Sequence, residues 1–185
     1  MIVTDADCKA LEAVEQASKN LGLRCISLTG CRHPGDARWT PAEVEELILS
    51  TPHDPVVVLV DDEGRSGEGW GERVIRHLAT SPKVKVMGVV AVASDMTGGR
   101  GAAVAASIDA RGERTPSGVN KEGAVERSCE RRVYGDTVEN LDELGIPVVI
   151  GIGDPGKMNF ADDAKSGAPI TTKALAEILH AYTLG

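Results

Sequence analysis

The sequence predicts a single α/β domain over residues 1–185, built on a mostly parallel, doubly wound sheet of about five strands. Short runs of β-branched residues alternate with segments of helical periodicity, which is typical of parallel strands joined by crossover helices. Residues 56–60 read Val-Val-Val-Leu-Val without a polar position, as expected for a strand covered on both faces. We therefore expect a three-layer sandwich of Rossmann-like or Toprim-like type with a β-hairpin excursion.

The first strand, helix and second strand follow one another closely. Residues 1–4 form a short apolar run that predicts a strand. In residues 6–21 the apolar positions recur at spacings of three and four, so one helical face is apolar, and Gly22 ends this helix. Residues 24–28 predict the second strand.

A loop separates the second strand from the next helix. Residues 29–38 are rich in Gly, Pro and polar residues, which predicts the loop. Thr40 and Glu43 have the spacing of a capping box, and Pro41 takes the first helical position, so a helix begins here. The buried strand at residues 56–60 follows it.

The middle of the chain supplies one more helix and strand before the pattern becomes irregular. A glycine-rich turn leads into a helix at about residues 71–80, and residues 84–93 predict an apolar strand. Residues 96–132 lose the alternation, and we expect a β-hairpin within them near residues 108–114.

The carboxyl-terminal part returns to the α/β pattern. Residues 137–144 predict a short helix closed by Gly145. Residues 147–152 predict a buried strand, and residues 171–182 predict the terminal helix.

The acidic balance limits the partners that we expect. The formal net charge is -8 at pH 7, which disfavours binding to nucleic acid or to anionic lipid, because both depend on clustered Lys and Arg. No apolar run reaches the roughly 18 residues of a membrane span, so we expect no direct membrane insertion. Residues 1–5 do not resemble a signal peptide, and we expect a cytoplasmic location.

The four cysteines do not form a Cys-x-x-Cys pair; they are Cys8, Cys25, Cys31 and Cys129. In a chain of this size we expect reduced thiols rather than a disulfide framework. Their spacing also matches none of the common zinc sites.

Carboxylates follow most of the predicted strands. In a parallel sheet, ligands collect outside the carboxyl ends of the strands, so side chains at these positions are candidates for function. Carboxylates that converge at one edge repel each other, and a hard cation such as Ca²⁺ or Mg²⁺ relieves the repulsion. The metal-ligand candidates are Asp5, Asp7, Asp61 and Asp62. Asp95 and Asp154 also follow strands, and each of these residues could instead cap a helix or form a turn.

Two glycine-rich segments are weaker candidates for ligand binding. Residues 64–72 connect a strand to a helix but lack the Gly-Lys-Ser/Thr ending of a phosphate-binding loop. Residues 151–156 match the letters of the dinucleotide fingerprint, yet Pro155 and the residues after it do not open the helix that this site needs. We therefore predict no nucleotide cofactor.

A series of segments in fixed order carries a resemblance to a known family. The first is Val3-Thr4-Asp5-Ala6-Asp7 and the last is Gly167-Ala168-Pro169-Ile170-Thr171. The blocks between them are residues 24–27, 54–64, 67–69, 88–94, 107–109, 118–123, 135–138, 151–154 and 156–158. Taken together, these segments resemble the family of the soluble stage V sporulation protein AE, and the resemblance extends over nearly the whole chain.

The resemblance implies a component of the machinery that moves calcium dipicolinate into the spore and releases it at germination. It implies a binding or assembly role beside membrane-embedded sporulation proteins, peripheral to the spore inner membrane, with calcium dipicolinate as a ligand to consider. It supplies no catalytic residues, and the sequence leaves a homo-oligomer open. The alternative is a Mg²⁺-dependent Toprim-like phosphoryl-transfer or nuclease-type enzyme, which also binds metal at strand ends. The order of the acidic residues disfavours it, because Asp5-Ala6-Asp7 comes first and Asp61-Asp62 later.

Overall fold

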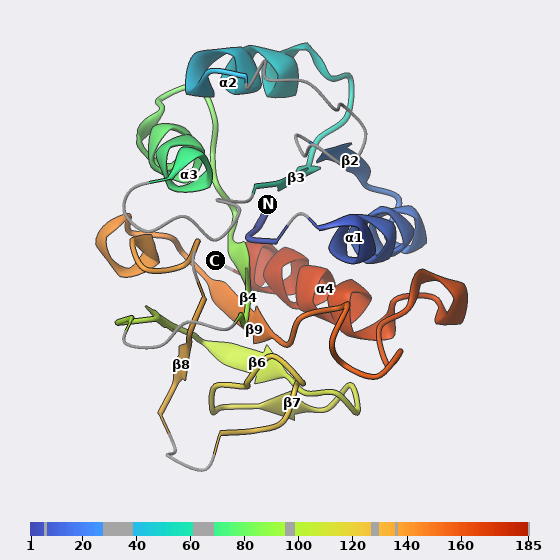
Figure 1. The fold of residues 1–185 in the computed structure, drawn as a ribbon. Helices are drawn as coiled ribbons and strands as arrows, with labels where there is room; N and C mark the ends of the chain where they lie inside the picture. Colours follow the sequence, from blue (N-terminus) through green and yellow to red (C-terminus); the bar gives the residue numbers. More distant parts are fainter. Residues whose placement is uncertain are drawn as a thin grey trace.

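The computed structural model describes residues 1–5, 7–27, 39–60, 69–94, 99–126, 130–135 and 137–184. Its centre is a seven-stranded sheet in which β7 alone runs antiparallel to its neighbour (Figure 1). The spatial order is β2 (Arg24–Ser27), β3 (Val56–Leu59), β1 (Ile2–Val3), β4 (Val89–Val92), β9 (Val149–Ile152), β6 (Ala106–Ile108) and β7 (Arg114–Thr115). The predicted α/β class with a mostly parallel sheet is confirmed. All five predicted strands are present, and the predicted hairpin is β6 and β7.

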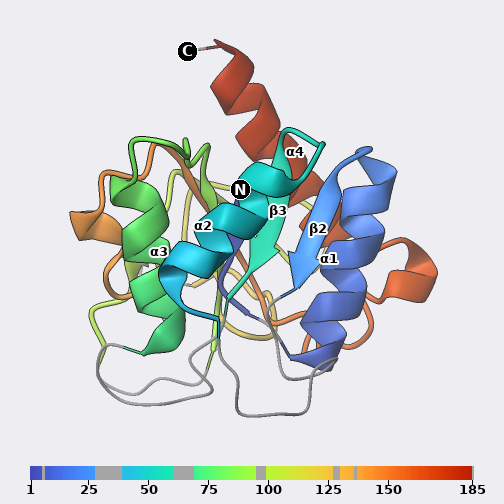
Figure 2. The same ribbon diagram turned by 90° about the horizontal axis from the view of Figure 1, so that it is seen from above.

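Helices cover both faces of the sheet. The helices in the described part of the chain are α1 (Cys8–Asn20), α2 (Pro41–Ser50), α3 (Trp70–Thr80) and α4 (Pro169–Leu184). Helices α1 and α4 lie together on one face, and α2 and α3 lie together on the other (Figures 1 and 2). The strand patterning explains this arrangement, because central parallel strands have apolar side chains on both faces.

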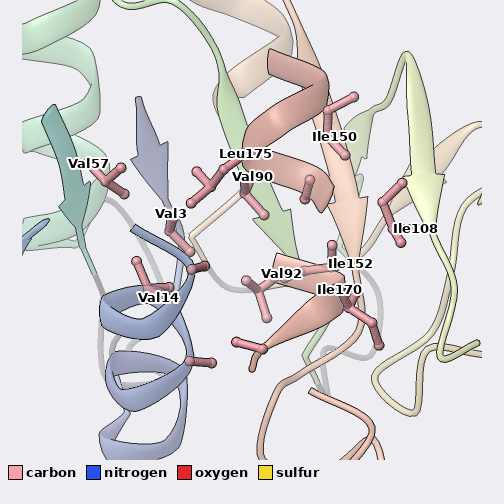
Figure 3. Close-up of a cluster of buried hydrophobic side chains, with 14 of the residues drawn as sticks. Val3, Val14, Val57, Val90, Val92, Ile108, Ile150, Ile152, Ile170 and Leu175 are labelled. Atoms are coloured by element: carbon pink, nitrogen blue, oxygen red, sulfur yellow. The ribbon is translucent and has the colours of Figure 1, made fainter. Parts of the chain in front are cut away.

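Alternate residues of each central strand enter two separate cores. In β4, Val90 and Val92 belong to the core under α1 and α4, whereas Val89 and Ala91 belong to the core under α2 and α3. Figure 3 shows the first core, in which Val90 and Val92 lie among side chains from neighbouring strands and from the two helices. Both cores are buried, so the sheet is a rigid support for the loops at its edges.

The helix starts follow the local sequence. Thr40 caps α2 through the predicted capping box, in which Glu43 N–H donates to Thr40 Oγ1 at 3.3 Å and Thr40 N–H donates to Glu43 Oε2 at 2.6 Å. Asp7 caps α1 in the same manner, and its Oδ1 accepts from the backbone N–H groups of Lys9 and Ala10 at 2.7 Å each. These caps satisfy amides that the first helical turn leaves without partners.

The predicted helix at residues 137–144 is wrong. The described part of this segment holds one 3₁₀ turn, Leu141–Glu143. Its acidic side chains are engaged elsewhere, because Glu139 accepts from Arg100 N–H at 3.0 Å and Asp142 accepts from Ala103 N–H at 2.8 Å. These bonds hold the segment against β5 (Ala102–Ala103), which pairs with β8 (Arg132–Val133) in a two-stranded sheet that the sequence did not predict.

The strand predicted at residues 84–93 is shorter in the structure. Only Val89–Val92 is paired as β4, because β1 begins to pair at Ile2, whose N–H donates to the Gly88 carbonyl at 3.1 Å. Within the described part of the chain, residues 84–87 have no neighbouring strand.

A second 3₁₀ turn, Ala164–Ser166, precedes α4. None of the helices in the described ranges is both long enough and apolar enough to cross a bilayer.

Candidate functional site

The candidate site lies at the carboxyl ends of β1 and β9. Strand β1 is followed by α1 and then by β2 on one side, whereas β4 and β9 lie on the other side of β1. The other strands of this sheet that precede β4 in the chain therefore lie on one side of β1, and its strands from β4 onward lie on the other side. In open α/β sheets this change of side opens a crevice at the carboxyl ends of the strands, where ligands bind.

Three carboxylates converge beside this crevice and form the acidic cluster of Asp5, Asp7 and Asp154. One oxygen from each residue lies within 4.8 Å of the oxygens from the other two. Asp5 is half-buried, Asp7 is exposed and Asp154 is buried. Because carboxylates at this separation repel one another, the arrangement favours a positive charge among them.

Asp5 and Asp7 are positioned by the turn from β1 into α1. The Thr4 hydroxyl accepts a hydrogen bond from Val92 N–H at 3.0 Å, which fixes the end of β1 against β4. The next carboxylate, Asp5, accepts from Asp7 N–H at 3.1 Å through Oδ1. Asp7 uses its Oδ1 to cap α1, which leaves Oδ2 facing the cluster.

Asp154 enters the cluster from the loop after β9. Its backbone N–H donates to the Lys121 carbonyl at 2.8 Å, and its Oδ1 accepts from Gly156 N–H at 2.8 Å. Only 5% of the residue is exposed. Its side chain is therefore held in one orientation by the loop and by the glycine amide.

Lys157 supplies the positive charge that the cluster needs in the structure. Its Nζ lies 2.8 Å from Asp154 Oδ2, and its side chain is nearly half exposed. Three carboxylates and one ammonium group leave a formal charge of -2, which is the charge that one divalent cation neutralises. The positive end of the α1 dipole lowers the repulsion further, but Asp7 already satisfies its amides.

The donor set fits a hard cation. Carboxylate oxygens are the ligands of Ca²⁺ and Mg²⁺, whereas soft or borderline metals would require Cys or His. Ca²⁺ takes about six to eight oxygen ligands and Mg²⁺ takes six. The cluster supplies three carboxylates, so water or a bound ligand would complete the shell.

Gly156 leaves the space beside the cluster open. A Cβ atom at this position would lie 3.1 Å from Asp154 Oδ1 and 3.5 Å from Asp7 Oδ2. A larger residue would therefore press on Asp154 and touch Asp7. Glycine at this position preserves access to their oxygens.

The structure brings together only part of the predicted ligand set. Asp5 and Asp7 lie in one cluster, as their spacing indicates, while Asp61 and Asp62 lie outside the described residues. The prediction did not choose Asp154, although it follows a strand just as Asp5 does. Its contribution depends on β9 lying two places from β1 in the sheet, which the sequence does not show.

The cysteines differ from the sequence prediction at one position. Cys8, the first residue of α1, is disulfide-bonded, so the expectation of reduced thiols is wrong there. Cys25 in β2 is half-buried and is not disulfide-bonded. Neither residue belongs to the acidic cluster.

Comparison with known proteins gives one match. The sequence model of the family described as Stage V sporulation protein AE1 matches residues 1–181 of the chain. Searches of curated proteins and of solved structures give no match. The match covers both the acidic cluster and the strands that position it.

Proposed function

The chain belongs to the stage V sporulation protein AE family and therefore takes part in sporulation, and from that premise we propose that it is a non-enzymatic component of the calcium dipicolinate machinery. In this role it binds a divalent cation, Ca²⁺ or Mg²⁺, and docks on membrane-embedded sporulation proteins at the spore inner membrane. Calcium dipicolinate is the ligand that would bring the cation and supply further oxygens to it.

The observation that carries the cation site is the convergence of Asp5, Asp7 and Asp154 from two separate loops. A helix cap explains Asp7, and a turn explains part of the Asp154 geometry. Neither explains why oxygens of three carboxylates from two loops lie within 4.8 Å of one another. A divalent cation supplies the reason, because it replaces repulsion with shared coordination.

Docking through a protein partner follows from charge. The net charge of -8 repels anionic lipid headgroups, so adsorption to the bilayer surface is unfavourable. A protein contact is therefore needed to hold the chain at a membrane. Such a contact also agrees with an assembly role rather than an independent catalytic one.

Calorimetric titration with CaCl₂, MgCl₂ and calcium dipicolinate tests the cation site directly. With only three protein ligands we expect weak binding, with a Kd of about 10⁻⁴ to 10⁻³ M. Asp154→Asn should weaken binding about tenfold or more, because it removes the charge of the buried ligand. Asp163→Asn is the matched control, since Asp163 caps a neighbouring 3₁₀ turn and lies outside the cluster.

Two further variants change affinity in opposite directions. Lys157→Met should strengthen cation binding several-fold, because the ammonium group competes for Asp154. Gly156→Ala should weaken it without a change of charge, because the new methyl group lies against two carboxylates. A cluster that serves only as a cap and turn would show no heat of binding in any of these proteins.

The sporulation role has its own measurement. Spores that lack the protein should contain or release less dipicolinate than wild-type spores. Unchanged dipicolinate content together with unchanged release would contradict the proposed role, whatever the calorimetry gives.

A further inference from the structure

An apolar groove lies at the amino-terminal edge of the sheet, opposite the acidic cluster, and is called here the amino-edge groove. It has a volume of about 570 Å³ and is bordered by the amino ends of β1 and β3 and by the segment before β4. Its apolar walls include Ile48, Leu49, Val56, Val86, Leu179 and Tyr182. This size lies within the range of sites that bind ligands or peptide segments.

One wall of the groove is formed by residues 84–87, which have no partner strand within the described part of the chain. These residues make no backbone hydrogen bond within the described part of the chain. Pairing resumes at Gly88, whose carbonyl accepts from Ile2 N–H. Free N–H and C=O groups along an extended segment are the feature to which another strand adds.

Exposed apolar side chains stand at the mouth of the groove. Leu49 at the end of α2 is 50% exposed, and Tyr182 near the end of α4 is 41% exposed. Figure 2 shows the carboxyl end of α4, the helix that contains Tyr182, extending beyond the body of the domain. Two exposed apolar side chains on separate helices therefore line one groove, where a bound segment could cover both.

The charge of the groove is opposite to that of the whole chain. Lys83 and Lys85 line it, whereas Asp54 is the single acidic residue among the described residues that line it. Lys83 pairs with Glu45 at 3.2 Å, yet two thirds of its side chain stays exposed. Lys85 Nζ lies 4.8 Å from the centre of the Tyr182 ring, so a cation and an aromatic face are presented together.

Lys83 and Lys85, called here the lysine row, are two residues apart in the chain and both line the groove. A strand that pairs with residues 84–87 would place every second side chain next to this row. Acidic side chains at those positions would be stabilised by the lysines, and the apolar side chains between them would enter the groove.

We propose that the amino-edge groove binds an extended segment of a partner protein, in which Asp or Glu alternates with apolar residues, by strand addition to residues 84–87. This proposal rests on the docking part of the proposed function and is independent of the cation site. Affinity comes from backbone pairing and the apolar walls, and specificity comes from the lysine row.

A synthetic peptide, acetyl-Val-Glu-Val-Glu-Val-Glu-Val-amide carrying a fluorescent label, tests the proposal on the full chain by anisotropy. A peptide with Lys in place of Glu, and one of equal composition with the four Val before the three Glu, are the controls. Lys85→Glu and Leu49→Asp should each weaken binding about tenfold. Lys165→Glu, at an exposed position outside the groove, makes the same charge change as Lys85→Glu and should leave affinity unchanged.

Hydrogen exchange separates strand addition from side-chain docking. The bound peptide should slow exchange of the amides at residues 84–87, whereas docking on the apolar walls alone would leave them unprotected. Three results would each overturn the proposal: no binding at about 1 mM peptide, equal affinity of the Lys85→Glu and Lys165→Glu proteins, or unprotected amides. A dimer in sedimentation that the peptide dissociates would assign the groove to a second copy of the chain and would also overturn it. Loss of peptide binding with normal cation titrations would leave the cation site standing.

Discussion

Replacing Asp162 with alanine is expected to destabilise the fold by about 2–4 kcal/mol. Asp162 is fully buried in the loop before α4. Its Oδ1 accepts from Ile170 N–H at 2.8 Å, and its Oδ2 accepts from the Thr171 hydroxyl at 2.6 Å and from Thr171 N–H at 3.1 Å. The carboxylate therefore satisfies the first amides of a helix that forms one side of the core.

The magnitude follows from what alanine leaves behind. Each buried amide without an acceptor costs about 1–3 kcal/mol, and two amides lose theirs. The Thr171 hydroxyl can rotate toward another acceptor and contributes less. Asp162→Asn should cost only about 1 kcal/mol, because its one side-chain oxygen can replace Oδ1, which accepts from both Ile170 N–H and Thr171 N–H.

Urea unfolding followed by circular dichroism measures the difference. In a domain of this size, the alanine variant should also lower Tm by about 5–15 °C. Asp163→Ala is the control, because Asp163 is the adjacent aspartate and caps only a short 3₁₀ turn. An Asp162→Ala cost equal to that of Asp163→Ala, or an Asn variant as unstable as the Ala variant, would refute the role assigned to the carboxylate.

The pH dependence of the same residue has a defined sign. Desolvation raises the pKa of Asp162 above its usual value, although hydrogen bonds from Thr171 and Ile170 oppose the rise. A raised folded-state pKa means that protonation favours the folded form. The contribution of Asp162 to the free energy of unfolding is fully present at pH values below the pKa of Asp in the unfolded chain, about 3.9. It is lost as the pH rises through the raised pKa of Asp162 in the folded protein. Asp162→Asn should remove this dependence.

Other parts of the fold give two further predictions. Gly151→Ala should destabilise the protein by about 1–3 kcal/mol in urea unfolding, because the new Cβ would lie 2.5 Å from Ser107 Oγ and 2.6 Å from Val133 Cγ2. An unchanged urea midpoint would contradict this, because it would show that the sheet moves enough to accommodate the methyl group. Desolvation alone would raise the pKa of Asp109 and of Asp142, but hydrogen bonds from backbone N–H groups and arginine lower both pKa values. The two ionised carboxylates therefore stabilise the folded protein at pH values above the pKa of Asp in the unfolded chain, about 3.9. This stabilisation is lost as the pH falls through the lowered pKa values of the folded protein. Asp109→Asn should therefore flatten the loss of stability below about pH 4, and an unchanged slope would contradict this assignment.

The strands and helices of the sheet could be predicted because their signals are local. The run Val56–Leu59 has no polar position, and the capping box of Thr40 and Glu43 spans one helical turn. Asp7 was predicted as a site residue for a similar reason, since it directly follows a strand. Such patterns act between residues that are near one another in the chain, where backbone geometry fixes the spacing.

The segments that the sequence did not predict depend on distant partners. The 3₁₀ turn Leu141–Glu143 replaces a predicted helix because Asp142 binds the backbone of Ala103 and the side chain of Arg132. Neither partner is near it in the chain. Local periodicity cannot reveal that these acidic side chains have other hydrogen bonds to make.

By itself, the sequence determined the fold class, the order of the four α-helices and of the parallel strands that they cover, and the fact that carboxylates follow those strands. Only the tertiary structure decided which carboxylates meet. Asp154 reaches Asp5 and Asp7 because β9 lies next to β4 and β4 lies next to β1. That order is set by how two cores are packed around the sheet, a property of the whole chain, because burying both faces of every central strand requires all of the helices at once.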